Sequence, residues 1–174
     1  GVVDFKDRTY IGKSIADYTL GFNINLNYKN FDLISYAYAS VGNDLIRNYE
    51  RTENKLNKLN YILDRWTGEG TSNTVPRVTT GASSNNLFSS YFVEDASFLR
   101  IQTIQLGYSL PKKVIDSFGI SKFRFYGSIN NVYTFSKYRG FDATANTGDP
   151  IAGGIDSGFY PAPRIFSIGL NVNF

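Results

Sequence analysis

The sequence predicts an all-β protein whose strands each have one apolar and one polar face. The clearest segment is 164–174, RIFSIGLNVNF, in which apolar and polar residues alternate at a period of two, the pattern of a strand with two different faces. Other segments alternate in the same way, and aromatic residues make up 16% of the chain. A tilted strand crosses a bilayer with about 9–11 residues, whereas a helix needs roughly 18 apolar residues in a row, and the chain has no such run. These observations predict strands of an outer-membrane β-barrel.

The composition excludes several classes of function. The 174 residues include no Cys, His or Met, which excludes thiol nucleophiles, imidazole bases, Cys/His zinc sites and disulfides. A net charge of +3 is too small to indicate a nucleic-acid partner. The mean hydropathy of −0.24 fits a barrel, because only every second residue of a barrel strand faces lipid. Since the chain starts at Gly1, we expect it to be part of a longer product, whose targeting signal was removed or lies upstream.

The first strand is predicted at 18–28, after a polar loop at 1–16 that shows no period. Its apolar residues alternate with small polar ones, and its apolar face begins and ends with Tyr. An aromatic residue at each end suits the two water interfaces of a membrane. Lys29 and Asn30 are predicted to form a tight turn after this strand.

The second strand is predicted at 31–41, and its two faces are less distinct. We assign Tyr36 and Tyr38 to the side that faces the barrel lumen. A register shift of one residue would exchange the two faces.

The segment 42–97 is too long for a hairpin turn and is predicted to be a long loop. Within it, 55–66 is predicted to be helical, because its apolar residues recur at helical spacing. Asn54 can cap the start of this helix and Gly68 can end it. The apolar residues of the pattern are Leu56, Leu59, Ile62, Leu63 and Trp66.

The third strand is predicted at 98–110. Its apolar residues occupy odd positions in the first half and even positions in the second half. Such a change of phase predicts a β-bulge near Gln102 and Thr103. Pro111 ends the strand pairing, and 112–119 can form one helical turn.

The last two strands are predicted at 122–135 and 164–174, with a Gly-, Asp- and Pro-rich loop at 136–163 between them. Short and long connections therefore alternate along the chain. Outer-membrane barrels have short periplasmic turns and long extracellular loops. The loops 42–97 and 136–163 are thus predicted to be extracellular, and the C-terminus periplasmic.

Five strands are too few to close a barrel, since the smallest barrels have about eight. An open sheet would leave two unpaired edges in the hydrocarbon of the bilayer, which is not tolerated. The chain is therefore predicted to be the C-terminal part of a larger transmembrane barrel. Expressed alone, it is not expected to form a closed monomeric barrel.

A series of short motifs runs in order through 18–174. They are YKNFDL at 28–33, GND at 42–44, DRWT at 64–67, VEDASFLR at 93–100, LGYSLPK at 106–112, NN at 130–131, FSKY at 135–138, GFD at 140–142, GFYPAPR at 158–164 and the terminal GLNVNF. Taken in this order, they resemble the C-terminal part of the SusC/RagA family of TonB-dependent outer-membrane transporters.

The resemblance implies a barrel of about 22 strands with an internal plug. It also implies a SusD-like surface lipoprotein that covers the extracellular loops, and uptake of oligosaccharides, glycans or peptides driven by TonB. The plug, the TonB box and most of the barrel strands would belong to a missing upstream segment. The terminal Phe174 would be the aromatic residue that the assembly machinery reads.

No arrangement of carboxylates predicts acid–base catalysis, so the chain is not expected to be an enzyme, and no cofactor is expected. Asp142, Asp149 and Asp156 in the Gly-rich loop favour turns over a metal site. Candidates for contact with the substrate or the lipoprotein are Trp66, Tyr138, Arg139 and Tyr160. Candidates for facing the lumen and contacting the plug are Arg100, Gln102, Gln105, Arg124, Asn130, Asn171 and Asn173.

These candidates also have ordinary structural interpretations. Trp66 is expected to pack its helix against its own loop, because apolar residues at helical spacing usually pack. The Tyr and Arg residues at the barrel mouth could belong to the interfacial girdle. Three other functions are kept as alternatives: a passive porin, a soluble β-rich glycan-binding module, and a structural or adhesive surface protein anchored by the barrel.

Overall fold

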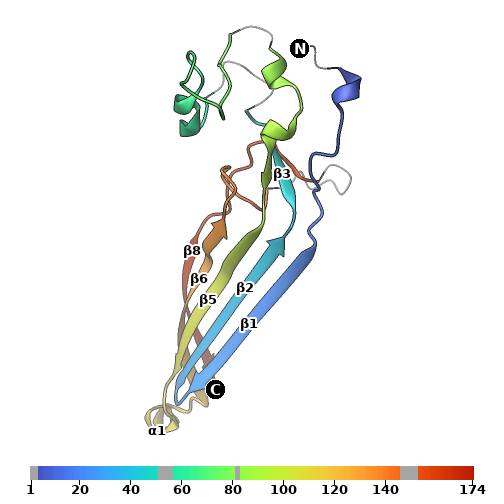
Figure 1. Ribbon diagram of the computed structural model, residues 1–174. Helices are drawn as coiled ribbons and strands as arrows, with labels where there is room; N and C mark the ends of the chain where they lie inside the picture. The colour runs from blue at the N-terminus through green and yellow to red at the C-terminus, as the bar shows by residue number, and fades with distance from the viewer. Residues whose placement is uncertain (1–3, 51–56, 81–82, 146–152) are drawn as a thin grey trace.

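The computed structural model describes residues 4–50, 57–80, 83–145 and 153–174. Its main feature is a five-stranded sheet with the strand order β1-β2-β5-β6-β8, in which all neighbours are antiparallel (Figure 1). The five predicted strands are present, and each boundary lies within one residue of the prediction. The strands are β1 (Tyr18–Tyr28), β2 (Phe31–Val41), β5 (Phe98–Ser109), β6 (Lys122–Ser136) and β8 (Ile165–Asn173).

The register separates an apolar face from a polar face across the whole large sheet. Residues that pair directly across antiparallel strands share a face, and Phe22 of β1 pairs with Ala37 of β2. Tyr36 and Tyr38 pair with Asn23 and Gly21, so they lie on the polar face, and their exposure to a barrel lumen stays a prediction. The apolar face carries Leu20, Phe22, Ile24 and Leu26 from β1, Leu33, Ala37 and Ala39 from β2, Leu99, Ile101, Ile104 and Leu106 from β5, Phe123, Phe125 and Ile129 from β6, and Phe166, Ile168, Leu170 and Val172 from β8.

The predicted β-bulge is present at Gln102. Toward β2, Ile101 and Thr103 pair with consecutive residues, so Gln102 has no partner there. Toward β6, the two residues Asn131 and Val132 lie opposite Gln102, and Asn131 has a positive φ of 53°. The extra residue keeps both apolar halves of β5 on one face of the sheet, which explains the change of phase in the sequence.

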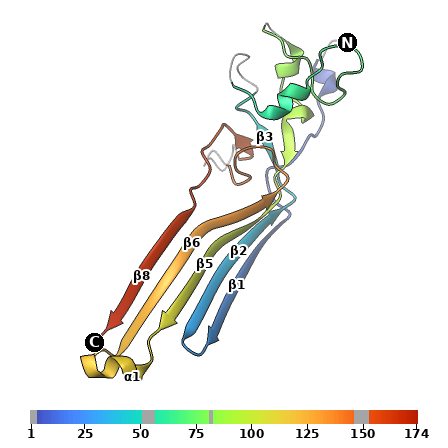
Figure 2. The same cartoon turned by 90° about the vertical axis from the view of Figure 1, so that its left-hand side faces the viewer.

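The two ends of the large sheet differ in their connections. The turn at Lys29 and Asn30 lies at one end, where Lys29 has a φ of 55°. The connection from β5 to β6 lies at the same end and contains helix α1 (Lys112–Ile115) and the 3-10 helix η5 (Asp116–Phe118). Figures 1 and 2 show α1 and the C-terminus at this end, and the long connections at the other end. We call the two ends the turn end and the loop end.

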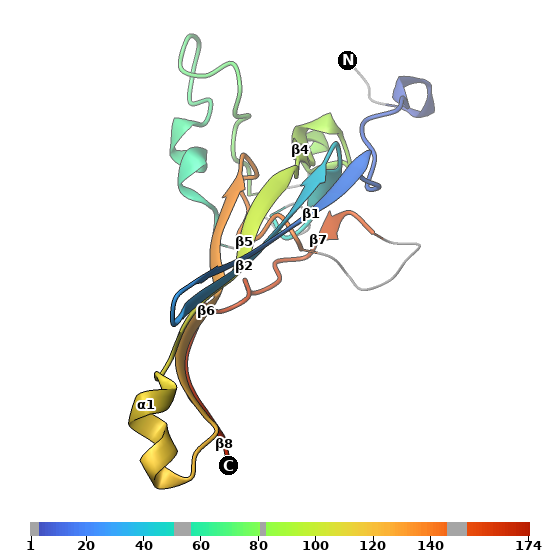
Figure 3. The same ribbon diagram turned by 90° about the horizontal axis from the view of Figure 1, so that it is seen from below.

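A second, smaller sheet lies at the loop end. It has the strand order β4-β3-β7, with β3 antiparallel to β4 and parallel to β7. Figure 1 shows β3 and Figure 3 shows β4 and β7. These strands could not be predicted from the sequence, because two to four residues are too few to show an alternation. They are β3 (Asp44–Arg47), β4 (Val93–Asp95) and β7 (Ile155–Asp156).

The helix predicted at 55–66 is wrong over the residues that the structure describes, since 51–56 lie outside them. Residues 60–64 form the 3-10 helix η2 (Asn60–Asp64) instead. No side chain caps its start, and Leu63 is exposed rather than packed on an apolar side. Tyr61 in η2 makes polar contacts with Arg47 and Glu50 in place of the expected apolar packing. The other 3-10 helices are η1 (Phe5–Asp7), η3 (Ser84–Asn86) and η4 (Ser90–Phe92).

The main cluster of buried apolar residues lies where the two sheets meet. Tyr38 and Phe98 contribute to it from the polar face of the large sheet. The apolar face of the large sheet is mostly exposed: Ile168 at its edge is 91% exposed. None of the described helices is long and apolar enough to cross a membrane. The cluster contains Leu45, Ala96, Phe98, Tyr138, Ala143 and Ala145, with Tyr38 packed against it.

Candidate functional site

Arg124 of β6 and Asp32 of β2 form a bidentate ion pair on the polar face, although β5 lies between their strands. Arg124 Nε donates to Asp32 Oδ1 at 2.8 Å and Nη2 donates to Oδ2 at 2.5 Å. The pair passes over Gly107 of β5, where a Cβ atom would lie 2.4 Å from both Arg124 Nη2 and Asp32 Oδ1. Glycine at this position therefore lets the guanidinium lie flat against the sheet.

Tyr126 of β6 lies over a second glycine on the same face. The register places Tyr126 in one row with Gly107 on one side and Gly169 of β8 on the other. A Cβ atom at Gly169 would lie 2.3 Å from Cζ of the Tyr126 ring. The Arg124 guanidinium is 5.0 Å from the centre of this ring. The two glycines thus leave room for an ion pair and an aromatic ring that together cover four strands. We call Asp32, Arg124 and Tyr126 the polar wall.

Arg100 connects the polar face to the long connection after β6. Its Nε donates to Thr134 Oγ1 at 2.7 Å, and its Nη2 donates to Asp142 Oδ1 at 2.5 Å. Both side chains of this ion pair are more than nine-tenths buried. The same Asp142 oxygen accepts bonds from the Thr144 amide at 2.9 Å and the Thr144 hydroxyl at 2.8 Å. Burial alone would raise the pKa of Asp142, but the bonds from Thr144 and Arg100 lower it below its ordinary value.

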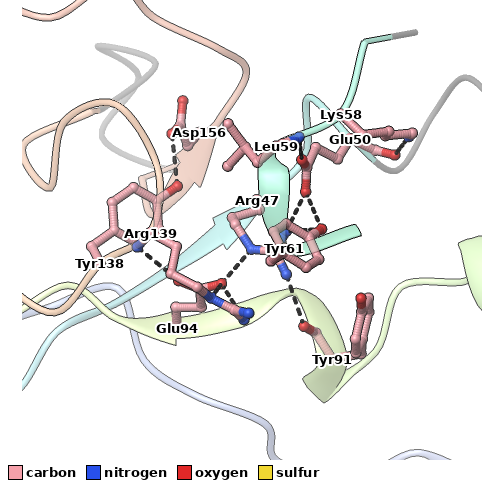
Figure 4. A network of polar contacts seen from close by, with 10 residues as sticks. All are labelled: Arg47, Glu50, Lys58, Leu59, Tyr61, Tyr91, Glu94, Tyr138, Arg139 and Asp156. Carbon is pink, nitrogen blue, oxygen red and sulfur yellow. Dashed lines mark hydrogen bonds and ion pairs between the residues drawn. The ribbon is translucent and has the colours of Figure 1, made fainter. Parts of the chain in front are cut away.

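A network of polar side chains joins the small sheet to the long connections around it (Figure 4). At its centre, the side chain of Arg47 in β3 is fully buried and forms ion pairs with Glu50 and Glu94. The contact of Arg47 Nε with Glu94 is an ion pair rather than an aligned hydrogen bond. Arg47 also donates to the Tyr61 hydroxyl at 2.7 Å and to the Tyr91 carbonyl at 3.3 Å. We call the set Arg47, Glu50, Tyr61, Glu94, Tyr138, Arg139 and Asp156 the loop cluster.

Tyr61 lies between the two arginines of the loop cluster. Its ring centre is 5.0 Å from the guanidinium carbon of Arg47 and 5.0 Å from that of Arg139. Its hydroxyl accepts from Arg47 and donates to Glu50. Glu94 holds Arg139 as well, because it accepts from the Arg139 amide at 3.0 Å and from Nε at 2.9 Å. Tyr61 therefore attaches η2 to both arginines through its ring and its hydroxyl.

Tyr138 and Asp156 extend the loop cluster to β7. The Tyr138 hydroxyl donates to Asp156 Oδ2 at 2.7 Å, and the Gly158 amide donates to Oδ1 at 2.8 Å. The Ile46 amide in β3 donates to the carbonyl of Gly154, immediately before β7. Burial and the bond to Asp156 raise the pKa of Tyr138, so its hydroxyl stays protonated over the ordinary pH range.

The charged groups of the loop cluster are paired with one another, which indicates a structural role. Burial disfavours the charge of Arg47, but Tyr61 and the two carboxylates outweigh it and raise its pKa. Glu50 and Glu94 are both occupied by arginine. Within the described parts of the chain, no three Asp or Glu residues gather in a group that could hold a metal ion. What this arrangement does is hold two long connections together at the loop end of the sheet.

The four residues predicted to contact a substrate or lipoprotein lie at the loop end in different settings. Tyr138 and Arg139 belong to the loop cluster, and Tyr138 is buried. Trp66 is partly exposed beside a pocket of about 590 Å³ that Arg77 and Tyr91 also line. Tyr160 is 93% exposed. Their contacts with a substrate or a partner stay predictions.

The residues predicted to face the lumen lie on the polar face by register, and Gln102 lies in the bulge. The structure joins Arg100 to Asp142, Arg124 to Asp32, and Asn130 to Thr103 across two strands at 2.9 Å. Contacts with a plug stay predictions, as does the role of the exposed Phe174 in assembly. On the polar face by register are Arg100, Gln105, Arg124, Asn130, Asn171 and Asn173.

The roles of Arg47 and Tyr61 and the pairing of Glu94 were not predicted from the sequence. Their partners lie far apart in the chain: Arg139 is 45 residues from Glu94. One signal did point here, since the motifs at 42–44, 93–100 and 140–142 all meet at the loop end. Glu94, Arg100 and Asp142 belong to these motifs, and they form the ion pairs that hold the connections.

The chain is similar over its whole length to known proteins. No family model matches it. "TonB-dependent receptor P3" of Formosa agariphila is 34% identical over 183 residues, which cover 100% of this chain and 18% of that protein. "TonB-dependent receptor SusC" of Bacteroides thetaiotaomicron is 32% identical, covering 100% of this chain and 17% of that protein. The chain thus spans less than a fifth of the length of these relatives.

Solved structures give the same result. The RagAB peptide importer in its closed-closed state superposes with a TM-score of 0.80 at 26% identity, covering 99% of this chain and 19% of that one. In its open-open state the TM-score is 0.72 at 28% identity, covering 90% of this chain and 17% of that one. The five-stranded sheet therefore matches a fragment of the barrel in such receptors.

Proposed function

Because the chain belongs to the SusC/RagA family of TonB-dependent receptors, we propose that it is the C-terminal part of an outer-membrane barrel that actively imports a nutrient. The observation that carries this proposal is the continuous separation of an apolar and a polar face across five strands. The apolar face meets lipid and the polar face lines the lumen. A soluble sheet would cover so large an apolar face with its own chain.

The edges of the sheet support a place within a larger barrel. In the described part of the chain, β1 pairs only with β2, and β8 pairs only with β6. Unpaired edges are not tolerated in hydrocarbon, so both need neighbouring strands from a barrel of about 22 strands. Those strands come from the remainder of the receptor, outside this chain.

The connections support an orientation. The short turns lie in the periplasm together with the C-terminus, and the loop cluster lies outside the cell. The polar wall and Arg100 then face the plug, and Trp66 and Tyr160 lie where a substrate or a SusD-like lipoprotein would approach. TonB acts through the N-terminal part of the receptor.

The relatives indicate two classes of substrate. RagAB is described as a peptide importer, and the family resemblance implies oligosaccharides and glycans as well. We propose import of an oligosaccharide or a peptide, with transport rather than catalysis as the activity.

Uptake of labelled oligosaccharide and peptide mixtures tests this proposal in cells that carry or lack the complete receptor. The expected result is receptor-dependent uptake of one mixture that stops when TonB is deleted. Uptake that continues without TonB would instead indicate a passive porin. Recovery of the receptor in the soluble fraction would overturn the membrane assignment and favour the soluble glycan-binding module.

A further inference from the structure

The connection between β5 and β6 presents two large apolar side chains that the described chain does not cover. Val114 is 53% exposed and Phe118 is 75% exposed, whereas the neighbouring Ile115 is 3% exposed. Val114 lies in α1 and Phe118 in the directly following η5, and we call these two exposed side chains the apolar tip. Figures 1 and 2 show that α1 extends beyond the ends of the strands.

The apolar tip is accompanied by positive charge. Lys112 and Lys113 begin α1, and the only acidic residue of the segment 110–121 is Asp116. Both lysines are exposed, and neither takes part in the ion pairs found among the described residues. Apolar side chains beside unpaired lysines form the pattern of a segment that lies at a membrane surface.

The connection that carries the tip begins beside an aromatic band of the apolar face. At the turn end, the register places Phe31 of β2 beside Tyr28 of β1 and Tyr108 of β5, and Tyr108 beside Phe125 of β6. The rings of Phe31 and Tyr108 are 4.7 Å apart. Such bands mark the level at which a barrel leaves the hydrocarbon. The segment 112–118 therefore begins at the level of the lipid headgroups.

We propose that 112–118 is a membrane foot that binds the periplasmic leaflet of phospholipid. Val114 and Phe118 enter the boundary between headgroups and acyl chains, and Lys112 and Lys113 bind lipid phosphates. Ile115 is buried and α1 contacts β6, so the segment is fixed to the sheet. The proposal rests on the proposed function for the position of the bilayer, and it adds an interaction that transport itself does not require.

Quenching of a fluorophore by lipid-borne nitroxides tests the foot directly. A single Cys for labelling is placed in the complete receptor, from which other cysteines have been removed, and the receptor is reconstituted in nanodiscs of phosphatidylethanolamine and phosphatidylglycerol. The nitroxide sits either near the headgroup or at the end of the acyl chain. The foot is probed by Phe118→Cys, with Asp116→Cys as its matched control. The bilayer itself is probed by Ile24→Cys on the apolar face of β1 and Asn25→Cys on the polar face.

Phe118→Cys is expected to be quenched more strongly by the headgroup nitroxide than by the chain-end nitroxide, and Asp116→Cys weakly by either. Ile24→Cys is expected to be quenched by the chain-end nitroxide, and Asn25→Cys by neither. If Ile24→Cys is quenched but Phe118→Cys is not, the foot is wrong and the membrane face stands. If Ile24→Cys is not quenched, the proposed membrane face itself fails.

The lysines are tested by reversing their charge. Lys112→Glu with Lys113→Glu is expected to weaken the enrichment of phosphatidylglycerol around the foot by up to about fivefold per lysine. Lys137→Glu at the loop end is the matched control and leaves this enrichment unchanged. Equal enrichment in all three proteins would overturn the phosphate contacts. A label at Phe118→Cys that lipid does not quench, but that whole cells shield from an aqueous reagent, would show a periplasmic protein as the occupant and overturn the foot.

Discussion

The large sheet exposes apolar residues, whereas the loop cluster buries charged ones. The large sheet leaves its apolar face exposed, with Ile168 and Phe166 open to the surroundings. The loop cluster buries charge, with Arg47 enclosed by carboxylates and tyrosines. The sheet therefore depends on a medium that its own chain does not supply, whereas the loop cluster supplies its own partners. This difference agrees with the proposed contact of the apolar face with lipid, and with loops that are held together by their own ion pairs.

The largest expected effect comes from Arg47→Ala, which leaves Glu50 and Glu94 buried without their central partner. Removing one partner of a buried ion pair costs about 3–5 kcal/mol. We expect the loops of the complete receptor to become sensitive to protease while the barrel stays intact. Limited proteolysis and heat-dependent gel mobility measure the two parts separately. Arg77→Ala, at an exposed arginine of the same long connection, is the control and should change neither.

Asp142 provides a test of the joint between the large sheet and the loop end. Its pKa is held below the ordinary value, so its stabilising effect is complete above the ordinary aspartate pKa of about 4 and is lost as the pH falls through the lower folded value. We expect the amides of residues 137–145 to lose protection, measured relative to their intrinsic exchange rates, below about pH 4. Asp142→Asn should reduce this protection at neutral pH and remove its dependence on pH. An unchanged pH profile in that variant would contradict the assignment.

Gly107→Ala tests whether the polar wall of the large sheet depends on its glycines. The new Cβ would lie 2.4 Å from Arg124 and Asp32, so the ion pair must move or break. Overpacking of this kind costs about 1–3 kcal/mol. Unfolding of the reconstituted receptor in denaturant measures the loss. Gly127→Ala is the matched control in the same sheet, because a Cβ there meets no described atom within 4 Å. Equal stability of the two variants would show that the flat wall is not required.

The same comparison explains how far the sequence was predictive. The strands of the large sheet were predictable because alternation is local, and even the bulge at Gln102 appeared as a change of phase. The loop cluster was not predictable, because Arg47 and Glu94 come together only through short strands that show no period. The helix predicted at 55–66 failed for the same reason: the spacing of apolar residues does not reveal that Tyr61 is held by two arginines from elsewhere. The burial of Tyr138 was equally invisible, since it depends on Asp156 from β7.

The smallest expected effects come from two buried tyrosine hydroxyls at the loop end, and these effects have opposite signs. Tyr138 donates to Asp156, whereas the hydroxyl of Tyr49 is buried without a hydrogen-bond partner among the described residues. Burial raises the pKa of Tyr49 to about 12. Removing a made hydrogen bond costs about 1 kcal/mol, whereas removing an unpaired buried hydroxyl relieves a cost of similar size. Tyr138→Phe should therefore destabilise the loop end, and Tyr49→Phe should stabilise it slightly.

Protease protection of the loops in the complete receptor measures the stability of both tyrosine variants. A general effect of losing a hydroxyl would change the stability in the same direction in both variants, whereas the hydrogen bonding seen here predicts opposite changes. Alkaline titration adds a second readout. The Tyr49 hydroxyl ionises more easily in the unfolded chain, so its titration does not change the stability below the ordinary tyrosine pKa of about 10 and lowers the stability as the pH rises from there toward the folded value of about 12. Tyr49→Phe should remove that part of the alkaline loss. If both variants destabilise the loops equally, the Tyr49 hydroxyl has a partner, and the loop cluster is larger than the residues assigned to it.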